Sequence, residues 1–482
     1  MARKILQEWL PLGMPAMAVV LDMVFLGLAG GMLLVHGWNT PFLVRWMLVG
    51  ALVLLALVIH RLTRPSSLVV LLTSGFFFSC FVKAWFDYGS RPVLVTLVLG
   101  AVLLAVHAPR LKGWLRVAAV NGALVLALLA LAEGWSGGGT SAQQKGYSTW
   151  RITESGARVA LSSHSIRNLD LGKAAQPGVV IREQMQQDGQ TDYDVTYTID
   201  DDGLRRTPDT GGPQAAPVLL FGGSYMFGEG VNDADTLGAV LARSSGRRVD
   251  VINHAYIGYG PHQMLSILEN GLDNRELKGR KPLAGVYLAI RDHIRRTVGL
   301  APWDSVGPRY YLDGDGHAYR AGNFDDGFEG RLLVMAKKSA LFSRLVSPAM
   351  AASSRSEALF TGVVATAAKL FHQRYGVPLR VVYWGTSGDA ATGRQVQALR
   401  AQGLEVMLVE QWLPGIAEHP LSYVYAHDWH PTPLAQCLLG VGIAQWLGVL
   451  DTAAVPDCDH LTGAEHGKQK NPFPHGSIRI NG

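Results

Sequence analysis

Serine, histidine and aspartate residues occur in this sequence where they can act together as a nucleophile, its base and the partner of that base. Ser224 lies in the segment FGGSYMFGEGV (221–231), directly after a run of apolar residues. Asp428 and His430 lie far along the chain in the segment YAHDWHPTPLAQ (425–436). A serine hydroxyl attacks an acyl carbon once a base takes its proton, and that base needs a carboxylate to fix its tautomer and stabilise its charge. The three residue types predict Ser224 as nucleophile, His430 as base and Asp428 as the partner of His430.

Apolar strands alternate with amphipathic helices around these residues, from about residue 216 to about residue 450. Such alternation is typical of a parallel sheet that is covered by helices on both faces. Reactive residues gather at the carboxyl ends of the strands in these sheets, and Ser224 follows the first strand directly. The predicted strands span residues 217–222, 249–255, 285–290, 379–385 and 404–410, and the predicted helices span about 236–245, 260–272, 355–376, 393–402 and 434–448.

Other roles for these residues stay open. Ser224 also fits a glycine-rich loop that caps a helix or binds phosphate, although the segment matches neither a P-loop nor the G-x-S-x-G turn. His427 is an alternative base, and Asp428 is an alternative cap for the helix that follows. His427, Asp428 and His430 are an alternative metal site, but zinc takes at least three protein ligands and no other His or Cys pair lies nearby. We expect no metal and no cofactor.

The segment around Ser224 resembles the first conserved block of the SGNH/GDSL hydrolases, which reads G-D-S with a further glycine four residues after the serine. Gly222, Ser224 and Gly228 match this block. Gly223 stands where the family usually has aspartate.

The segment around His430 resembles the last block of the same family, an aspartate followed by His-Pro and a helix of small residues. Asp428 and His430 are spaced as D-x-H, whereas D-x-x-H is commoner in the family. The resemblance covers about 216–450. It implies a flavodoxin-like three-layer α/β/α domain and a Ser/His/Asp mechanism directed at esters.

Two further segments are similar to the family blocks that supply oxyanion donors. The segment 253–263 follows the second predicted strand, and the resemblance implies that Gly258 offers its backbone N–H to an oxyanion. The segment AIRDHIRR (289–296) follows the third strand but departs from the usual G-x-N-D. Arg291 is the candidate donor there because an arginine can donate and an ionised aspartate cannot. The arginines of this segment are also consistent with a salt-bridged rim or with a subsite for an anionic polymer.

The first 135 or so residues contain few acidic groups and read as a membrane region. Five apolar stretches lie at about 14–36, 42–61, 66–85, 92–107 and 115–133. A helix of about 20 apolar residues crosses a bilayer. With the amino terminus inside, the inner segments carry seven Lys and Arg residues and the outer segments three, which favours five spans and an extracytoplasmic remainder.

The sequence therefore predicts five segments in order. A transmembrane region of about five helices (1–135) is followed by a linker (136–146), a small β-rich lead-in (147–215), an SGNH-like catalytic domain (216–450) and a C-terminal tail (451–482).

Net charge and cysteine content exclude some classes of function. The formal net charge of +5 is modest, and no basic stripe interleaved with aromatic residues is present, so we expect no nucleic-acid partner. Three cysteines form neither a disulfide framework nor a zinc ribbon. Whether Cys437 and Cys458 pair in an oxidising compartment stays open.

These features together predict a multi-pass protein of the bacterial inner membrane whose serine esterase domain lies on the periplasmic side. The expected substrate is an O-acylated, for example acetylated, polysaccharide of the cell envelope or a secreted one, by analogy with other envelope-facing SGNH proteins. The expected partners are the membrane, that polysaccharide and acyl-donor or polysaccharide-assembly proteins. Two alternatives remain, an O-acetyltransferase subunit of an exopolysaccharide modification system and a non-catalytic polysaccharide-binding or assembly subunit.

Overall fold

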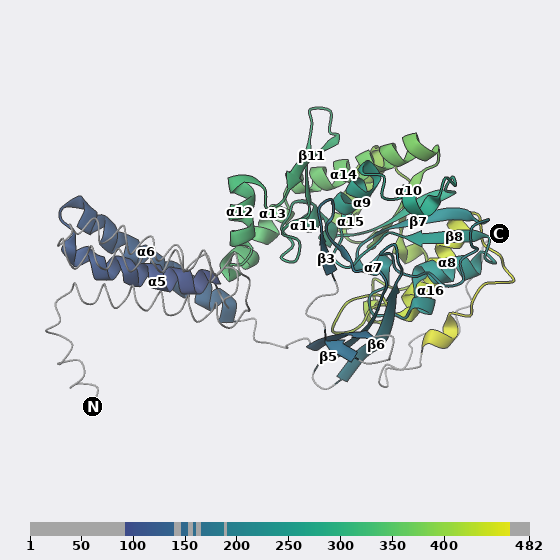
Figure 1. Ribbon diagram of the computed structural model, residues 1–482, viewed down its shortest axis with the longest axis horizontal. Helices are drawn as coiled ribbons and strands as arrows, with labels where there is room; N and C mark the ends of the chain where they lie inside the picture. Colours follow the sequence, from purple (N-terminus) through teal and green to yellow (C-terminus); the bar gives the residue numbers. More distant parts are fainter. Residues whose placement is uncertain (1–91, 139–145, 153–157, 161–164, 188–189, 463–482) are drawn as a thin grey trace. The chain divides into compact units, whose positions relative to one another are not determined.

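The computed structural model describes residues 92–138, 146–152, 158–160, 165–187 and 190–462 (Figure 1). The chain forms two compact units. One comprises Met1–Thr140 with Met335–Val346, and the other comprises Ser141–Val334 with Ser347–Gly482. The segment 335–346 thus groups with the amino-terminal unit, although the sequence assigns it to the catalytic domain.

The described part of the first unit is built on a pair of apolar helices, α5 (Pro92–His107) and α6 (Trp114–Gly138), which the short η1 (Ala108–Arg110) joins. Within the described residues, one helix is long and apolar enough to cross a membrane, over Trp114–Ser136 of α6. The apolar part of α5, Val93–Ala105, is shorter. The predicted stretches 14–36, 42–61 and 66–85 lie outside the described residues, so the predicted bundle of five helices is not confirmed.

The surface of α6 is apolar and largely exposed. Leu124, Leu128 and Leu131 expose 59%, 67% and 71% of their surface and follow one another at helical spacing. Trp114 and Trp135 are 76% and 86% exposed at the two ends of the apolar stretch. At 1.5 Å per residue the two rings are separated by about 31 Å along the helix, close to the thickness of a hydrocarbon core, and tryptophan favours both of its boundaries.

Glu133 ties the segment 335–346 to the last turns of α6. Its side-chain oxygens accept hydrogen bonds from the hydroxyl of Ser339 at 2.7 Å and from the backbone N–H groups of Ala340 and Leu341 at 2.6 and 3.0 Å. Glu133 is only 6% exposed, so these donors compensate a carboxylate that would otherwise be costly to bury.

We expect Glu133→Gln to loosen this segment, because the amide has one acceptor oxygen for three donors. Limited proteolysis with trypsin in detergent should cut after Lys337 or Lys338 several times faster than in the unmodified protein. Glu329→Gln, at an exposed carboxylate of α12 (Gly327–Ala336), is the matched control and should leave the rate unchanged. Equal rates in all three proteins would contradict the tie.

A five-stranded parallel sheet forms the centre of the second unit (Figure 1). Its order is β13-β12-β9-β7-β8. Numbered by their place in this sheet, the strands run 2-1-3-4-5, which is the flavodoxin-like order, so the predicted α/β fold class is confirmed. The strands are β7 (Ala216–Gly222), β8 (Val249–Asn253), β9 (Ala284–Ile290), β12 (Leu379–Trp384) and β13 (Val406–Leu408).

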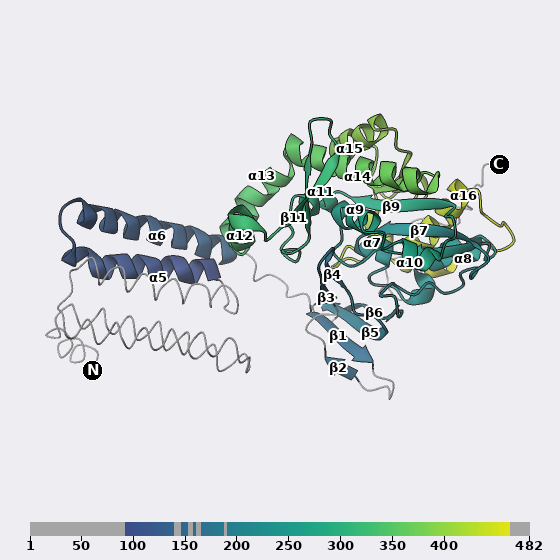
Figure 2. The same cartoon turned by 45° about the horizontal axis from the view of Figure 1, so that its top comes forward.

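Helices cover both faces of this sheet. Helices α9 and α14 lie on one side and α8 and α16 on the other, as Figures 1 and 2 show. All five predicted helices are present. They are α8 (Leu237–Ser244), α9 (Pro261–Glu269), α14 (Ser354–Tyr375), α15 (Ala390–Ala401) and α16 (Pro433–Trp446).

The sequence signals for these elements are local. β9 is buried along its whole length, as expected of a central parallel strand. Helix α14 begins after Ser353, whose hydroxyl accepts from the N–H of Ser356, and ends at Gly376 in the left-handed conformation.

Shorter elements fill the connections. They are α7 (Ser224–Phe227), η2 (Asp233–Asp235), α10 (Asn274–Leu277), α11 (Asp292–Thr297), β10 (Pro308–Leu312), β11 (Ala318–Asn323), η3 (Phe342–Val346), α13 (Ser347–Ala351), η4 (Val409–Gln411), η5 (Pro420–Ser422) and η6 (Asp459–Thr462).

The lead-in, residues 147–215, is rich in antiparallel strands. One sheet has the order β2-β1-β5-β6, and β3 and β4 form a separate hairpin. Side chains of β5 alternate between buried and partly exposed positions, so one face of the sheet is available for packing. The strands are β1 (Gly146–Ile152), β2 (Arg158–Ala160), β3 (Ser165–Asn168), β4 (Gly172–Ala175), β5 (Val179–Gln187) and β6 (Gln190–Ile199).

A disulfide joins Cys437 in α16 to Cys458, with a Cα–Cα distance of 5.9 Å. The sequence left this pairing open. The bond fastens the beginning of the C-terminal tail to the last helix of the sheet domain, and both sulfur-bearing residues are buried with Val240 and Val441.

We expect Cys458→Ser to lower the free energy of unfolding by about 3 kcal/mol, because the bridge closes a 21-residue loop in the unfolded chain. Urea unfolding of the oxidised proteins measures this difference. Under a strong reductant the variant and the unmodified protein should have the same midpoint. A difference that persists under reduction would mean that the serine, not the lost bond, is responsible.

Candidate active site

Ser224 lies at the carboxyl end of β7, where the chain turns into the single turn of α7. The N–H of Phe227 donates to the carbonyl of Gly223, and the N–H of Gly228 donates to the carbonyl of Ser224, both at 2.9 Å. Gly228 closes the turn with φ of 83°, and a Cβ there would lie 2.8 Å from the Thr236 side chain. The turn thus presents the Ser224 hydroxyl at the sheet edge where the sequence places the reactive residues.

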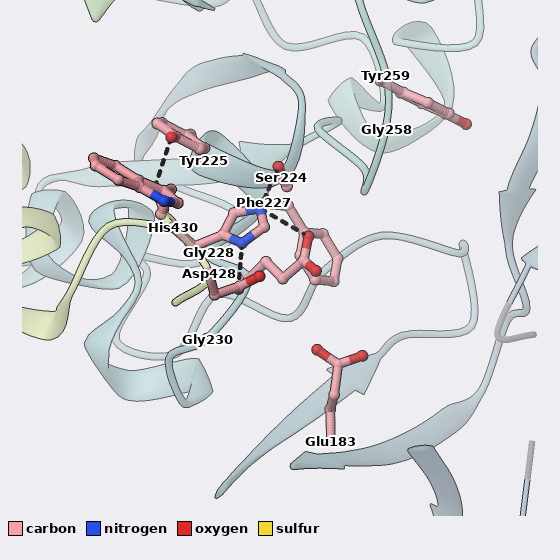
Figure 3. A network of polar contacts seen from close by, with 12 residues as sticks. Glu183, Ser224, Tyr225, Phe227, Gly228, Gly230, Gly258, Tyr259, Asp428 and His430 are labelled. Atoms are coloured by element: carbon pink, nitrogen blue, oxygen red, sulfur yellow. Dashed lines mark hydrogen bonds and ion pairs between the residues drawn. The ribbon is translucent and has the colours of Figure 1, made fainter. Parts of the chain in front are cut away.

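The structure brings Ser224, His430 and Asp428 into one hydrogen-bonded chain (Figure 3). The Nε2 atom of His430 lies 2.9 Å from the Ser224 Oγ, and its Nδ1 atom lies 2.5 Å from Asp428 Oδ2. Asp428 is buried and Ser224 is 4% exposed. This is the arrangement in which a histidine accepts a serine proton while a carboxylate stabilises the resulting charge.

The D-x-H spacing is made possible by an unusual backbone at Trp429. Its φ is 66°, in the left-handed region that few residues other than glycine adopt. The Trp429 carbonyl accepts a hydrogen bond from the Tyr225 hydroxyl at 2.6 Å, and its N–H donates to the carbonyl of Tyr425 at 2.9 Å. These contacts hold a conformation that costs about 1–3 kcal/mol, and so keep Asp428 and His430 on one side of the loop.

The alternative roles of the histidine block are not the ones the structure presents. The ring of His427 is paired with Asp192 of β6, at 2.8 Å, and His430 faces Ser224. The cap of α16 is Thr432, whose hydroxyl accepts from the N–H of Ala435.

Asp428, His430 and Glu229 each offer one atom that could bind a metal, and these three atoms lie within 4.8 Å of one another. Both ring nitrogens of His430 already have hydrogen-bond partners, which favours proton transfer over metal ligation here.

The lead-in supplies polar groups that contact Asp428, the partner of His430. The sequence did not reveal these contacts. The hydroxyl of Tyr193 lies 3.2 Å from Asp428 Oδ2 and 3.3 Å from Glu183 Oε1. Tyr197 donates to the same Glu183 oxygen at 2.9 Å and accepts from the N–H of Gly230. Tyr193 and Tyr197 stand four residues apart in β6 and hence on one face of the strand, which is the one local signal of their shared role.

Arg205 of the same region fastens the loop that follows Ser224. It is 2% exposed, and its guanidinium donates to the carbonyls of Gly228 and Val231 at 3.2 and 2.9 Å. It also forms an ion pair with Asp233 at 2.8 Å.

His430 carries a perturbed pKa. Burial by itself lowers the pKa of this histidine, but the negative charge of Glu229 and the hydrogen bond to Asp428 outweigh burial and raise it above its usual value. A raised pKa means that His430 binds its proton more tightly than a free imidazole does.

The oxyanion candidates have different outcomes. Gly258 has φ of 81°, and a Cβ there would meet Trp303 Nε1 at 2.7 Å and Lys173 Nζ at 2.8 Å, so the position requires glycine. Its role as a donor stays a prediction. Arg291 is exposed at the start of α11, and its charge acts on Tyr383 and Asp389.

Among the described residues, no hydrogen bond joins Arg291 to Ser224 or Gly258. The two arginines that follow Arg291 pair instead with Asp292, each at 2.7 Å, which fits a salt-bridged role better than a donor role.

The resemblance to the SGNH/GDSL hydrolases implies a flavodoxin-like sheet and a Ser/His/Asp set. The structure has that strand order, and it joins Ser224, His430 and Asp428 by hydrogen bonds. The protein thus resembles the SGNH/GDSL hydrolases. No family model and no curated protein matches it.

Two solved structures are similar to this chain. One, assigned to the lipolytic G-D-S-L family and from Desulfitobacterium hafniense, is 11% identical with a TM-score of 0.27 and covers 49% of this chain and 99% of its own. The other, assigned to the SGNH hydrolases and from Slackia heliotrinireducens, is 17% identical with a TM-score of 0.26 and covers 48% of this chain and 98% of its own.

We expect Tyr193→Phe to lower the free energy of unfolding by about 2 kcal/mol, because two buried carboxylates share the donor that it removes. Urea unfolding measures the change. Tyr311→Phe, at an exposed ring of β10, is the matched control and should change it by less than about 0.5 kcal/mol. Equal losses in the two variants would show that the hydroxyl of Tyr193 has no special role.

Proposed function

We propose that this protein is a serine esterase or acyl hydrolase of SGNH type, with Ser224 as nucleophile, His430 as general base and acid, and Asp428 as the partner of His430. The observation that carries the proposal is the unbroken chain from Ser224 Oγ through both ring nitrogens of His430 to Asp428. A serine that only capped a helix would not need a buried base and carboxylate aligned behind it.

The reaction begins when His430 Nε2 takes the Ser224 proton and Oγ forms a bond to the acyl carbon. The carbonyl oxygen becomes an oxyanion, for which backbone N–H groups of Ser224 and Gly258 are the candidate donors. The bond to the leaving alcohol then breaks, and His430 returns its proton to the departing oxygen. Water or a second alcohol repeats these steps on the acyl-serine and releases Ser224.

The location and substrate are proposed on separate grounds. The apolar helix α6 supports attachment to the bacterial inner membrane, and the Cys437–Cys458 bond supports a domain in an oxidising compartment such as the periplasm. An acylated polysaccharide of the envelope is the proposed substrate class, with acyl-donor or polysaccharide-assembly proteins as partners. Transfer to a sugar hydroxyl, as in an O-acetyltransferase subunit, uses the same steps with a different acceptor.

A fluorophosphonate probe tests the proposal on the full chain in detergent. It should label the unmodified protein on Ser224, and Ser224→Ala should abolish both labelling and hydrolysis of a chromogenic acetate ester. Peptide mapping of the labelled protein identifies the modified residue. If the unmodified protein is folded, as a cooperative melting transition shows, but is not labelled, the result would instead favour a non-catalytic binding or assembly subunit. Acylated oligosaccharide that accumulates with donor and acceptor present would identify transfer.

A further inference from the structure

A second carboxylate lies against the nitrogen of His430 that faces the nucleophile. Glu229 Oε2 is 3.2 Å from His430 Nε2, and Ser224 Oγ is 2.9 Å from the same atom. The Glu229 side chain is only 9% exposed. A histidine with Asp428 on one nitrogen and Glu229 on the other is thus placed between two carboxylates.

The backbone leaves Glu229 little freedom to move away. Its N–H donates to the carbonyl of Ser224 at 3.0 Å. Gly228 and Gly230, labelled in Figure 3, flank it in the left-handed conformation, with φ of 83° and 86°. A Cβ at Gly230 would lie 2.8 Å from the ring of Tyr425, whose hydroxyl donates to the Gly230 carbonyl. Glycine on both sides therefore allows the tight loop that brings this carboxylate to His430.

The contact has a definite meaning for the protonation of His430. When neutral His430 donates its Nδ1 proton in a hydrogen bond to Asp428, its Nε2 atom carries a lone pair. An ionised carboxylate has no proton to donate to that lone pair. The Glu229 contact is attractive only when Nε2 carries a proton, that is, when His430 is an imidazolium. Ser224 needs the opposite state, because it can give its proton only to the lone pair.

We propose that Glu229 is a positioning residue that stabilises the imidazolium form of His430 and so sets the pH above which Ser224 becomes nucleophilic. The proposal rests on the proposed serine mechanism and adds to it a second proton-holding partner. When His430 takes the Ser224 proton, the new Nε2–H bond points between Oγ and Glu229, and the ion pair stabilises the charge that has formed. The same proton later passes to the leaving alcohol, which restores the lone pair.

Two other carboxylates near His430 act in the same direction as Glu229, and uncharged and cationic groups also lie nearby. Asp428 and Glu183 are carboxylates whose charges raise its pKa, and the ring of Tyr225 packs edge-on against the imidazole with centroids 5.5 Å apart. Tyr193 approaches through Asp428. The lead-in also brings cations close: Lys173 is within electrostatic reach of Glu229, and Arg205 donates to the carbonyl of Gly228, the residue before Glu229. Glu229, in contrast to these groups, is in direct contact with His430 Nε2.

The sign of the pH effect follows. Below its raised pKa His430 is protonated and cannot take the Ser224 proton, so reaction at Ser224 falls as the pH falls. Removing the Glu229 charge lowers the pKa of His430 and moves this decline to lower pH.

The rate of fluorophosphonate labelling as a function of pH tests this on the full chain in detergent. Glu229→Gln should shift the midpoint of the acid limb down by about one unit, a roughly tenfold faster reaction at pH values below both midpoints. Glu229→Asp, which keeps the charge at a greater reach, should lie between the two. Glu418→Gln, at an exposed carboxylate, is the matched control and should reproduce the unmodified profile.

A second readout separates this inference from the esterase proposal. In Ser224→Ala protein with 13C-labelled histidine, the His430 resonance, assigned by its loss in a His430 variant, should titrate about one unit lower with Glu229→Gln added. Identical midpoints in this titration would overturn the role of Glu229, whether or not the probe labels Ser224. A shifted midpoint in a protein that never labels would overturn the esterase proposal and leave the coupling of Glu229 and His430 standing.

Discussion

The contact between His430 and Ser224 is the constraint around which the second unit is arranged. The two residues are 206 positions apart in sequence, and their side chains meet at 2.9 Å only if the end of β7 and the loop before α16 are both fixed. The parallel sheet fixes the first, because β7 lies in its interior between β8 and β9. The left-handed Trp429 and its hydrogen bond to Tyr225 fix the second, since Tyr225 is the residue next to Ser224. Each half of the site thus supports the other.

The lead-in belongs to this arrangement and is more than a spacer between the amino-terminal helices and the sheet domain. It buries Glu183 and Arg205, charges that would be costly without partners. The tyrosine hydroxyls of β6 satisfy Glu183, and four acceptors on the loop after Ser224 satisfy Arg205. Because a buried network of this kind is stable only when complete, the position of the lead-in and the shape of the loop after Ser224 are coupled.

Sequence reasoning recovers the parts of the fold that local patterns encode. The five strands and five main helices of the sheet domain lie within a few residues of their predicted bounds, because burial imposes a period on each segment and the caps of α14 are local. The sequence also singled out Ser224, Asp428 and His430, and the structure brings these three side chains together.

What sequence reasoning missed depends on contacts between distant segments. Nothing near Tyr193 indicates that its hydroxyl reaches Asp428, and nothing near Glu133 indicates that its partners lie about 200 residues away. Arg291 shows the converse limit. The sequence placed it as an oxyanion donor by register alone, and in the structure it lies at the start of α11, where its charge acts on Tyr383 and Asp389.

The glycine at position 223 has a physical reason in the same interior. A Cβ there would lie 2.7 Å from Arg296 Nη1, 2.9 Å from the Tyr259 carbonyl and 3.0 Å from His293 Nε2. Arg296 cannot withdraw easily, because it donates to the Tyr259 carbonyl at 2.7 Å and is paired with Asp292. The space beside Gly223 is filled by side chains of Arg296 and His293, from the segment 289–296, and by the Tyr259 carbonyl, from the segment 253–263. The glycine beside Ser224 and the larger side chains of the segment 289–296 therefore fit together, and the hydroxyl of Ser224 lies beside His430.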